Sequence, residues 1–454
     1  MKQQLYYMYC LAVHICLLFN AMTRHSFVPI EFCNGIIVPL LKCKHGDASQ
    51  LDMYRGITLS PVLSKLFESV LLDLFGLFLT SSDLQFGFKK NLGCSHALFA
   101  FNETVRYFMN NNSRAFGAFL DISKAFDKVL HNGLFKKLLD RNVPVCLVLL
   151  LKYWYGHLQC AVRWNNALGN WFSILSGVRQ GGVLSQVLFS VYIDDLITDL
   201  KLSRYGANIG NIFAGCLLYA DDIVLLSPTC HGLQKLITAC EQYGRLWDLK
   251  FNSLKSQVAT FGSKCPTNPI ITLLNAPLQW ADKVKYLGVY IVSNTALTDI
   301  SNHVRQFYSR FNNVLSVIGK GSREMCTVTL HLNKVYCLPS LTYGCETWTL
   351  NDQSINRVNV AWNNSFRHIF SGFWWESVKP LQYYTATLPI SYFIDQRKLL
   401  FWKKMAIHNN NFLASLSLLL QNCFYAIGSL YITTMSASVG QIKSAVWSKF
   451  IETV

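Results

Sequence analysis

The sequence lacks the cysteine pattern of a structural zinc site. None of its 15 cysteines forms a C-x-x-C pair, and no group of cysteines and histidines has the spacing of zinc ligands. The cysteines are scattered from Cys10 to Cys423, and their number is odd. We expect most of them to be buried thiols of a protein in a reducing compartment.

The sequence also lacks a clear membrane-spanning segment. Residues 5–19 are apolar but shorter than the ~20 residues that a transmembrane helix needs, and His14 interrupts them. They do not match a signal peptide, because a single lysine precedes them and no clear cleavage site follows. Residues 412–434 are long enough but contain Gln421 and Asn422. We expect two buried helices, and a protein with several membrane spans is the alternative.

Acidic residues are scarce, with 25 aspartates and glutamates against 41 lysines and arginines, a formal charge of +16. This excess points to a polyanionic partner, either nucleic acid or an anionic membrane surface. A basic protein without such a partner is the alternative. Hydrophobic residues make up 51% and aromatic residues 14% of the 454 residues, which excludes general disorder and supports about two to four domains.

The middle of the chain has the pattern of alternating strands and helices. The apolar run at 116–120 predicts a buried strand, and residues 122–139 have the apolar spacing of a helix. Helical spacing also predicts a helix over residues 183–196. Residues 216–226 hold two apolar runs around an alanine and two aspartates, which predicts a strand, a tight turn and a strand.

Two adjacent carboxylates, Asp221 and Asp222, are therefore expected at a hairpin turn within an apolar run. Burying an unpaired charge is costly, so a partner is expected. If the strand before Asp121 lies beside this hairpin, three carboxylates converge and raise each other's pKa unless a cation joins them. Mg²⁺ fits, because one or two carboxylates plus substrate phosphates usually hold it. The alternative is a turn or capping role for each aspartate; Asp194 and Asp195, for comparison, are expected on the solvated side of a helix.

The last third of the chain is basic and rich in aromatic residues. Residues 301–410 hold twelve lysines and arginines against five acidic residues, an excess of 12 − 5 = 7. We expect a helical domain that faces nucleic acid, with Arg397, Lys398, Lys403 and Lys404 on its binding face. The interleaved aromatic residues would serve the same face: Phe307, Tyr308, Trp348, Trp362, Phe366, Trp374, Trp375 and Trp402. The alternative is an ordinary basic helical domain.

Nine segments follow one another in the order of a known enzyme family. They are IIVPLLKCKHGD, YRGITLSPVLSKLFESVL, LQFGFKKNLGCSHAL, FLDISKAFDKV, SGVRQGGVLSQVLFSVYIDDL, YADD, FNSLKSQ, VKYLGVYI and LPSLTYGCETW. Over roughly residues 15–350 the chain thus resembles the reverse transcriptase of non-LTR, LINE-type retrotransposons. YADD alone would be a weak signal, whereas nine ordered segments are a strong one.

The resemblance implies a right-hand polymerase of α+β class, with a small antiparallel sheet in its palm. Fingers are expected over 1–115, the palm over 116–292 with 128–180 partly in the fingers, and a helical thumb over 293–410. Residues 411–454 form a tail to which we assign no role. The implied activity is DNA synthesis from deoxynucleotides on an RNA template, starting from a DNA primer.

The resemblance also implies roles for individual residues. Catalytic metal ligands would be Asp121, Asp221, Asp222 and the carbonyl of Ile122, holding two Mg²⁺ ions for which Mn²⁺ could substitute. The residues that would contact the incoming nucleotide are Phe126 at the sugar 2′ position, Gln180, Gly181 and Gly182 along the pocket, Arg55 and Lys89 at the triphosphate, and Lys255 near the leaving group. Phe126 could instead be a core aromatic residue, and the three basic residues could be surface charges.

The chain departs from the family pattern in three places. Gln186 stands where proline normally follows the serine at the start of a helix, a position that proline favours. The family's endonuclease would precede residue 1, and the last ~35 residues match no segment that we can name. These departures support a rival reading, in which the chain is a truncated and catalytically degenerate remnant that still binds nucleic acid.

Overall fold

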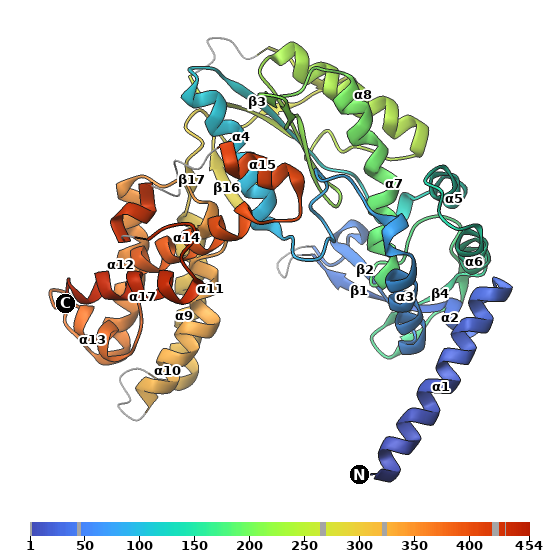
Figure 1. Cartoon of the computed structure of the whole chain (residues 1–454), viewed down its shortest axis with the longest axis horizontal. Coiled ribbons are helices and arrows are strands. Elements are labelled where there is room, and N and C mark those ends of the chain that lie inside the picture. Colours follow the sequence, from blue (N-terminus) through green and yellow to red (C-terminus); the bar gives the residue numbers. More distant parts are fainter. Residues whose placement is uncertain (1, 43–46, 264–268, 320–324, 420–425, 432) are drawn as a thin grey trace.

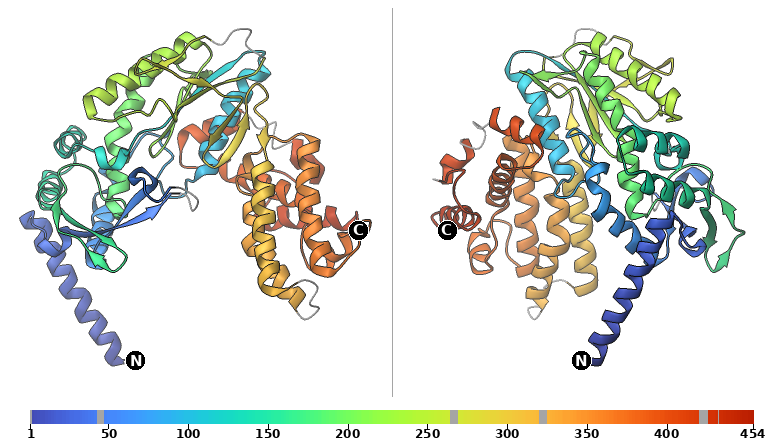
Figure 2. Two further views of the ribbon diagram at one scale, coloured as in Figure 1. Left: turned by 180° about the vertical axis from the view of Figure 1, so that it is seen from behind. Right: turned by 45° about the vertical axis from the view of Figure 1, so that its right-hand side comes forward.

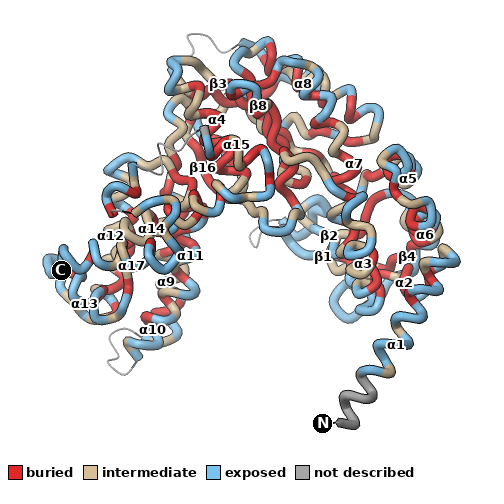
Figure 3. The backbone as a smooth tube through the Cα atoms, viewed as in Figure 1, coloured by how far each residue is buried: buried red, intermediate tan, exposed pale blue. Residues whose placement is uncertain are grey.

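The chain forms an arch, with a β-sheet at its crown and one limb on either side (Figures 1 and 2). This computed structural model describes residues 2–42, 47–263, 269–319, 325–419, 426–431 and 433–454. Buried residues run continuously through the crown and into both limbs (Figure 3). The sheet at the crown carries the predicted acidic residues at one end.

The crown sheet has five strands in the order β14-β11-β3-β10-β9. Strand β3 lies between β10 and β11 and is antiparallel to both. It can occupy the middle because its sequence, AFGAFL, is an uninterrupted apolar run suited to burial on both faces. The strands are β3 (Ala115–Leu120), β9 (Cys216–Tyr219), β10 (Asp222–Ser227), β11 (Gln257–Phe261) and β14 (Gln279–Trp280).

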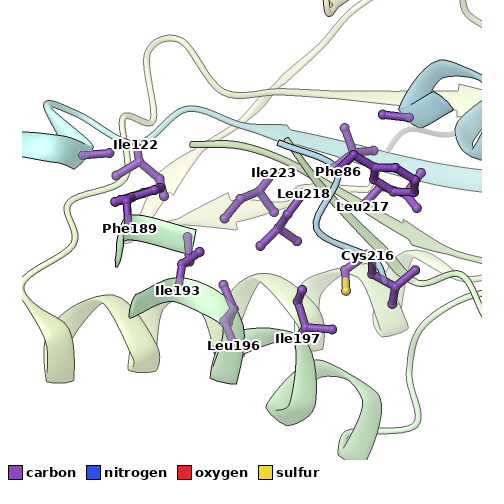
Figure 4. Packing of buried hydrophobic residues seen from close by; sticks show 14 of the residues in the cluster. Phe86, Ile122, Phe189, Ile193, Leu196, Ile197, Cys216, Leu217, Leu218 and Ile223 are labelled. Atoms are coloured by element: carbon purple, nitrogen blue, oxygen red, sulfur yellow. The ribbon is translucent and has the colours of Figure 1, made fainter. Parts of the chain in front are cut away.

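Three helices cover this sheet. They are α4 (Cys94–Asn110), α7 (Val183–Leu202) and α8 (Cys230–Trp247). Figure 4 shows Ile193, Leu196 and Ile197 of α7 pointing toward the hairpin of β9 and β10. On α4, the Phe101 ring lies 5.7 Å from the Phe119 ring of β3. The predicted strand at 116–120, hairpin at 216–226 and helix at 183–196 are confirmed.

The helix predicted over residues 122–139 is wrong in its first half. Only a 3₁₀ turn, η3 (Ala125–Lys128), forms there, and the helix α5 (His131–Asp140) begins later. Lys124 has a left-handed φ of 50°, which a helix does not allow. The carbonyls of Phe126 and Val129 accept hydrogen bonds from the N–H groups of Val178 and Gly177, both at 2.8 Å. This pairing with a distant segment replaces the helical hydrogen bonds that local sequence predicts.

The first limb is built on a second sheet, in the order β2-β1-β4-β5 with β6 paired to β4. Its strands are β1 (Asn34–Leu41), β2 (Tyr54–Leu59), β4 (Gln159–Trp164), β5 (Ala167–Leu168) and β6 (Phe172–Ser173). The helical segments around it are α1 (Lys2–His25), α2 (Ile30–Cys33), η1 (Leu51–Met53), α3 (Val62–Phe75), η2 (Gly76–Leu79), α5 and α6 (Val145–Gly156).

Helix α1 contains residues 5–19 but is not the buried helix that we expected. It projects from the limb (Figure 1), and Leu11 and Leu17 are 62% and 63% exposed. Its attachment is through Phe19, whose ring lies 4.8 Å from the Phe67 ring. None of the described helices is long and apolar enough to span a bilayer. The other apolar stretch, 412–434, is helical over 411–419, and residues 420–425 and 432 lie outside the described residues.

Further short strands lie around the crown and between it and the second limb. They are β7 (Asn208–Ile209), β8 (Ile212–Phe213), β12 (Thr272–Leu273), β13 (Ala276–Pro277), β15 (Lys283–Tyr286), β16 (Val289–Val292) and β17 (Thr298–Asp299). The limb itself is helical, as predicted for residues 301–410. Its segments are α9 (Ser301–Ile318), α10 (Cys326–Leu332), the π-helical η5 (Asn333–Cys337), α11 (Leu338–Leu341), η6 (Cys345–Thr347), α12 (Asp352–Phe370), α13 (Lys379–Tyr384) and α14 (Ile390–Ala406).

The aromatic residues of this limb are mostly core residues, contrary to the prediction that they face nucleic acid. Phe307, Trp348, Trp362 and Phe366 are at most 2% exposed and form a second hydrophobic core. The spacing of aromatic residues along a helix is the same whether the rings pack in a core or form a stacking surface, which explains the error. Of the eight aromatic residues predicted to face nucleic acid, Trp374 and Trp375 are exposed, at 79% and 64%.

The last helices return to the crown. The end of α14 and helix α15 (Asn411–Leu419) belong to the main core, where Trp402 meets the Phe99 ring at 4.9 Å. Phe412 packs against Phe86 at 6.4 Å. The remaining segments are η7 (Ser429–Tyr431) and α17 (Val439–Ile451). The first part of the tail thus packs against α4 and the segment around Phe86, next to the sheet that carries the acidic residues.

Candidate active site

The hairpin of β9 and β10 brings the three predicted acidic residues to one end of the crown sheet. Tyr219 pairs with Asp222, so Ala220 and Asp221 form a two-residue turn in which Ala220 has a left-handed φ of 58°. In the neighbouring pair of strands, Ile223 lies opposite Leu120. Asp121 follows Leu120 directly and is therefore level with Asp222 in this register.

The carboxylates affect one another electrostatically. The pKa of Asp222 is raised from 3.8 to about 6, first by loss of surrounding water and then by the charges of Asp221 and Asp121, although the residue remains exposed at the sheet end. Burial is also the largest cause that raises the pKa of Asp221, and the charge of Asp121 adds to it. None of the ion pairs within the described residues includes these three carboxylates. Their mutual repulsion therefore favours a bound cation.

The donor set suits a hard divalent cation that brings its own additional ligands. Within the part of the chain that is described, no group of three or more His, Cys, Asp and Glu side chains is arranged to hold a metal ion by itself. Mg²⁺ does not need one, because it is usually bound by one or two carboxylates together with waters and substrate phosphates. Three repelling carboxylates at an open sheet end meet that requirement.

The peptide after Asp121 is fixed by a neighbouring segment. The Asn252 N–H donates to the Asp121 carbonyl and the Ser123 N–H donates to the Lys250 carbonyl, both at 2.8 Å. The Ile122 side chain is buried and lies close to Phe189 (Figure 4). The backbone on either side of the Ile122 carbonyl is thus held in place, as a carbonyl ligand requires.

Phe126 lies at the edge of the core. Its ring stacks on the Phe189 ring at 4.7 Å with an interplanar angle of 20°, and the Phe88 ring meets it edge-on at 6.0 Å. The residue keeps intermediate exposure. One side of the ring is therefore packed while part of it stays open to solvent, so the ring can serve both of the roles considered for it.

The glycine segment predicted to line a nucleotide pocket packs against β2. The Gln180 carbonyl accepts a hydrogen bond from the Thr58 N–H at 2.7 Å, and its side chain donates to Asp127 at 3.3 Å. Gly181 has a φ of +121°, and a Cβ there would lie 2.6 Å from the Thr58 carbonyl oxygen, so only glycine fits. Gly182 precedes α7. Beside Gln180, Thr58 and Asp127 lies a cavity of about 250 Å³.

The three predicted phosphate-binding cations occupy different settings. Arg55 is exposed on β2, and its charge partly offsets the causes that raise the pKa of Asp221. Lys255 is exposed in the turn whose Asn252 contacts Asp121, and its N–H donates to Asn252 Oδ1 at 3.2 Å. Lys89 differs, because its ammonium donates to the Ser81 and Ser82 carbonyls at 2.8 and 2.6 Å. The structure thus ties Lys89 to a turn.

Asp194 is not on a solvated helix face, contrary to our expectation, whereas the Asp195 side chain is 48% exposed but paired. Arg141 donates to Asp194 at 2.8 Å, and the Ser82 N–H donates to the same carboxylate at 2.7 Å. Lys137, which is 2% exposed, donates to Asp195 at 2.7 Å. The two acids have cationic partners, unlike those at the hairpin. The spacing of residues within α7 could not reveal these ion pairs, because Lys137 lies in α5 and Arg141 directly follows that helix.

Sequence reasoning also missed Glu68, which positions the start of α7. Its carboxylate accepts hydrogen bonds from the N–H groups of Val183 and Leu184 and pairs with Arg179 at 3.1 Å. Glu68 and Arg179 are 3% and 8% exposed. Removing one partner of such a buried pair typically costs about 3–5 kcal/mol. A glutamate within the apolar run of α3 was the available signal.

Comparisons with known proteins agree with the predicted resemblance. The model of a family described as reverse transcriptase (RNA-dependent DNA polymerase) matches residues 43–291. The probable RNA-directed DNA polymerase from transposon X-element of Drosophila melanogaster is 27% identical over 373 residues, which cover 80% of this chain and 40% of that protein. The polymerase from mobile element jockey of the same species is 25% identical over 383 residues, 81% of this chain and 41% of its own.

A solved structure shares the fold. The telomerase from Candida tropicalis, in complex with a fragment of telomeric RNA, has a TM-score of 0.50 and 12% identity, and the alignment covers 95% of this chain and 67% of that one. The predicted right-hand polymerase fold is confirmed. The chain spans 40% and 41% of the two curated relatives above.

Proposed function

Because the chain belongs to the reverse transcriptase (RNA-dependent DNA polymerase) family, we propose that it copies RNA into DNA as the polymerase of a non-LTR retrotransposon. One observation carries the proposal. Asp121, Asp221 and Asp222 meet at one sheet end and form no ion pair within the described residues, and burial together with neighbouring carboxylate charges raises the pKa of Asp221 and of Asp222. Such a cluster is the chemistry of a divalent-cation site.

The three aspartates, with the carbonyl of Ile122, would hold two Mg²⁺ ions, for which Mn²⁺ could substitute. When bound, such ions activate the primer 3′-hydroxyl and stabilise the charge that develops on the leaving pyrophosphate. Arg55 would bind triphosphate oxygens, and its charge, which acts on Asp221, supports this assignment. Lys255 lies in the turn beside Asp121. We do not assign Lys89 this role, since two backbone carbonyls hold its ammonium.

The proposed nucleotide site lies between the two sheets. Phe126 would contact the sugar, and Gln180, Gly181 and Gly182 would border the base and the phosphates, beside the cavity next to Thr58. The RNA template, the DNA primer and the deoxynucleotides are the expected partners. The RNA-bound telomerase that shares the fold supports the template assignment.

The rival proposal, an inactive remnant that binds nucleic acid, rests in part on Gln186. The structure weakens that support, because Gln186 lies in the first turn of α7 with an exposed side chain. Glu68 already accepts hydrogen bonds from the N–H groups of Val183 and Leu184 at this helix start. The helix therefore begins without the proline that the family pattern has there.

Primer extension tests the proposal. Purified protein would be incubated with a DNA primer annealed to an RNA template, deoxynucleotides and Mg²⁺, with an identical DNA template in parallel. We expect extension on RNA that requires the divalent cation and stops on chelation. Template binding without extension under any divalent cation would favour the remnant instead.

A further inference from the structure

Gln85 is a buried polar residue that the proposed mechanism does not use. Its side chain is fully buried, and its Oε1 accepts hydrogen bonds from the Gly87 N–H at 2.9 Å and the Ala220 N–H at 3.0 Å. Its Nε2 donates to the Ala220 carbonyl at 3.5 Å. The amide thus contacts both polar groups of the residue that precedes Asp221.

The segment around Gln85 is itself paired with the hairpin. Gln85 bridges to Leu218 in parallel orientation. The Phe86 N–H donates to the Leu218 carbonyl at 2.8 Å, and the Leu218 N–H donates to the Leu84 carbonyl at 2.9 Å. Figure 4 shows Phe86 lying beside Leu217. Residues 84–87 therefore extend the crown sheet beyond its edge strand β9.

The hairpin turn needs this support. Ala220 has a φ of 58°, a conformation that is unfavourable for a residue with a Cβ and persists only where surroundings enforce it. Gly87 approaches it so closely that a Cβ on Gly87 would lie 2.4 Å from the Ala220 nitrogen. The contact between residues 85–87 and Ala220 thus determines how the turn presents Asp221.

We propose that Gln85 is a positioning residue of the polymerase site, whose amide fixes the Ala220 peptide and thereby the direction of the Asp221 carboxylate. The inference rests on the proposed function. Without the amide, two buried N–H groups lose their acceptor, and the turn must rearrange to satisfy them. Misplacement of a reacting group by about 1 Å can lower a rate by about 10²-fold.

The chain provides a matched control in Gln234. Its Oε1 accepts from the Thr272 N–H at 2.8 Å and its Nε2 donates to the Thr272 carbonyl at 3.0 Å, the same double contact with one residue. It joins α8 to β12, neither of which carries an acidic residue of the site. Loss of this contact should affect stability alone.

The test compares Gln85→Met with Gln234→Met in the full chain. Methionine keeps the length of glutamine but removes its hydrogen bonds. Thermal unfolding, primer–template affinity, single-turnover extension and Mn²⁺ binding by electron paramagnetic resonance would be measured. For Gln85→Met we expect extension to fall by about 10²-fold and Mn²⁺ affinity to weaken, with template affinity unchanged. For Gln234→Met we expect a lower Tm with unchanged extension and Mn²⁺ affinity.

Two results would overturn the proposal: wild-type extension and Mn²⁺ affinity in Gln85→Met, or equal losses in both variants. If Gln85→Met does not fold, Gln85→Asn decides, since it keeps the amide but is one methylene too short to hold Ala220; wild-type rates in this variant would reject the role. Failure of the proposed function is distinct, because the wild type would then extend no primer while the Mn²⁺ comparison still tests Gln85.

Discussion

Asp222 links the charge of the site to the stability of the fold. Its pKa in the folded chain, about 6, lies above the ordinary value of 3.8. The unfolded chain therefore releases this proton more readily, and ionisation of Asp222 opposes folding when no cation is bound. The penalty grows as pH rises from about 4 to about 6 and is complete above that range.

Asp222→Asn should therefore raise the Tm of the metal-free protein at pH 8, and the gain should shrink as pH falls toward about 4. With added Mg²⁺ the wild type should have the higher Tm of the two proteins, because it binds the ion better. Differential scanning calorimetry across this pH range, with chelator and then with Mg²⁺, measures both effects. Equal Tm values for the two proteins at pH 8 without metal would show that Asp222 carries no such penalty.

Phe126 tests how the site selects its sugar. Phe126→Val should increase ribonucleotide incorporation relative to deoxynucleotide, because the ring would no longer crowd the 2′ position. A lower Tm is expected as well, since the ring stacks on Phe189. The measurement is the ratio of kcat/KM for the two nucleotides. A reduced Tm with an unchanged ratio would mean that the ring serves only the core.

Among the helices, the basic residues of α14 have partners within the chain. Arg397 donates to Glu346 at 2.7 Å, Lys403 donates to the Met435 carbonyl at 3.0 Å, and burial is the largest cause that lowers the pKa of Lys398. Arg397 and Lys403 thus have contacts within the chain, and the phosphate-binding face that we expected them to form with Lys398 and Lys404 stays a prediction. Charge counts could not reveal this, because they ignore what each cation touches.

Replacing Arg397 and Lys403 together by glutamine should lower the Tm and leave the salt dependence of template binding unchanged. If these residues did contact phosphates, each lost contact would reduce the slope of log affinity against log salt concentration by roughly 0.9. Lys404→Gln serves as the control, since Lys404 is exposed on the same helix. A weaker salt dependence of template binding in the double variant, with an unchanged Tm, would show that these residues of α14 bind nucleic acid.

Helices and strands could be predicted where the local sequence pattern determines them. The apolar run of β3, the hairpin and α7 follow from local sequence. Residues 122–130 do not, because the carbonyls of Phe126 and Val129 bind the distant Gly177–Val178 segment. The acidic cluster could be placed because its residues end predicted strands. The role of Gln85 could not be predicted, because its side chain binds Ala220, a residue 135 positions away in the sequence.

Across the chain, the segment after residue 406 supports the crown. The Asn410 side chain donates to the Asp83 carbonyl at 2.8 Å, the Asn411 N–H donates to the Asp83 carboxylate at 3.1 Å, and Phe412 contacts Phe86. These contacts brace the segment that holds Ala220. The tail, to which the sequence alone assigned no role, thus packs against the segment that contacts the hairpin of the site.

Phe412→Ala should therefore lower the Tm and the extension rate together, because Phe86 would lose its contact with the Phe412 ring. Burying a phenylalanine typically contributes about 3–5 kcal/mol relative to alanine. Leu416→Ala, elsewhere on α15, is the comparison for loss of packing alone. An unchanged extension rate in Phe412→Ala, at a temperature where it is folded, would separate α15 from the site.

Asp221→Asn decides whether the hairpin acids are the catalytic centre. Single-turnover extension on an RNA template, with template affinity and Tm measured on the same samples, is the direct comparison with the wild type. We expect extension to be abolished while affinity stays the same and the metal-free Tm does not fall, because the substitution removes charge but little volume. Wild-type extension by Asp221→Asn would contradict the assignment of the site.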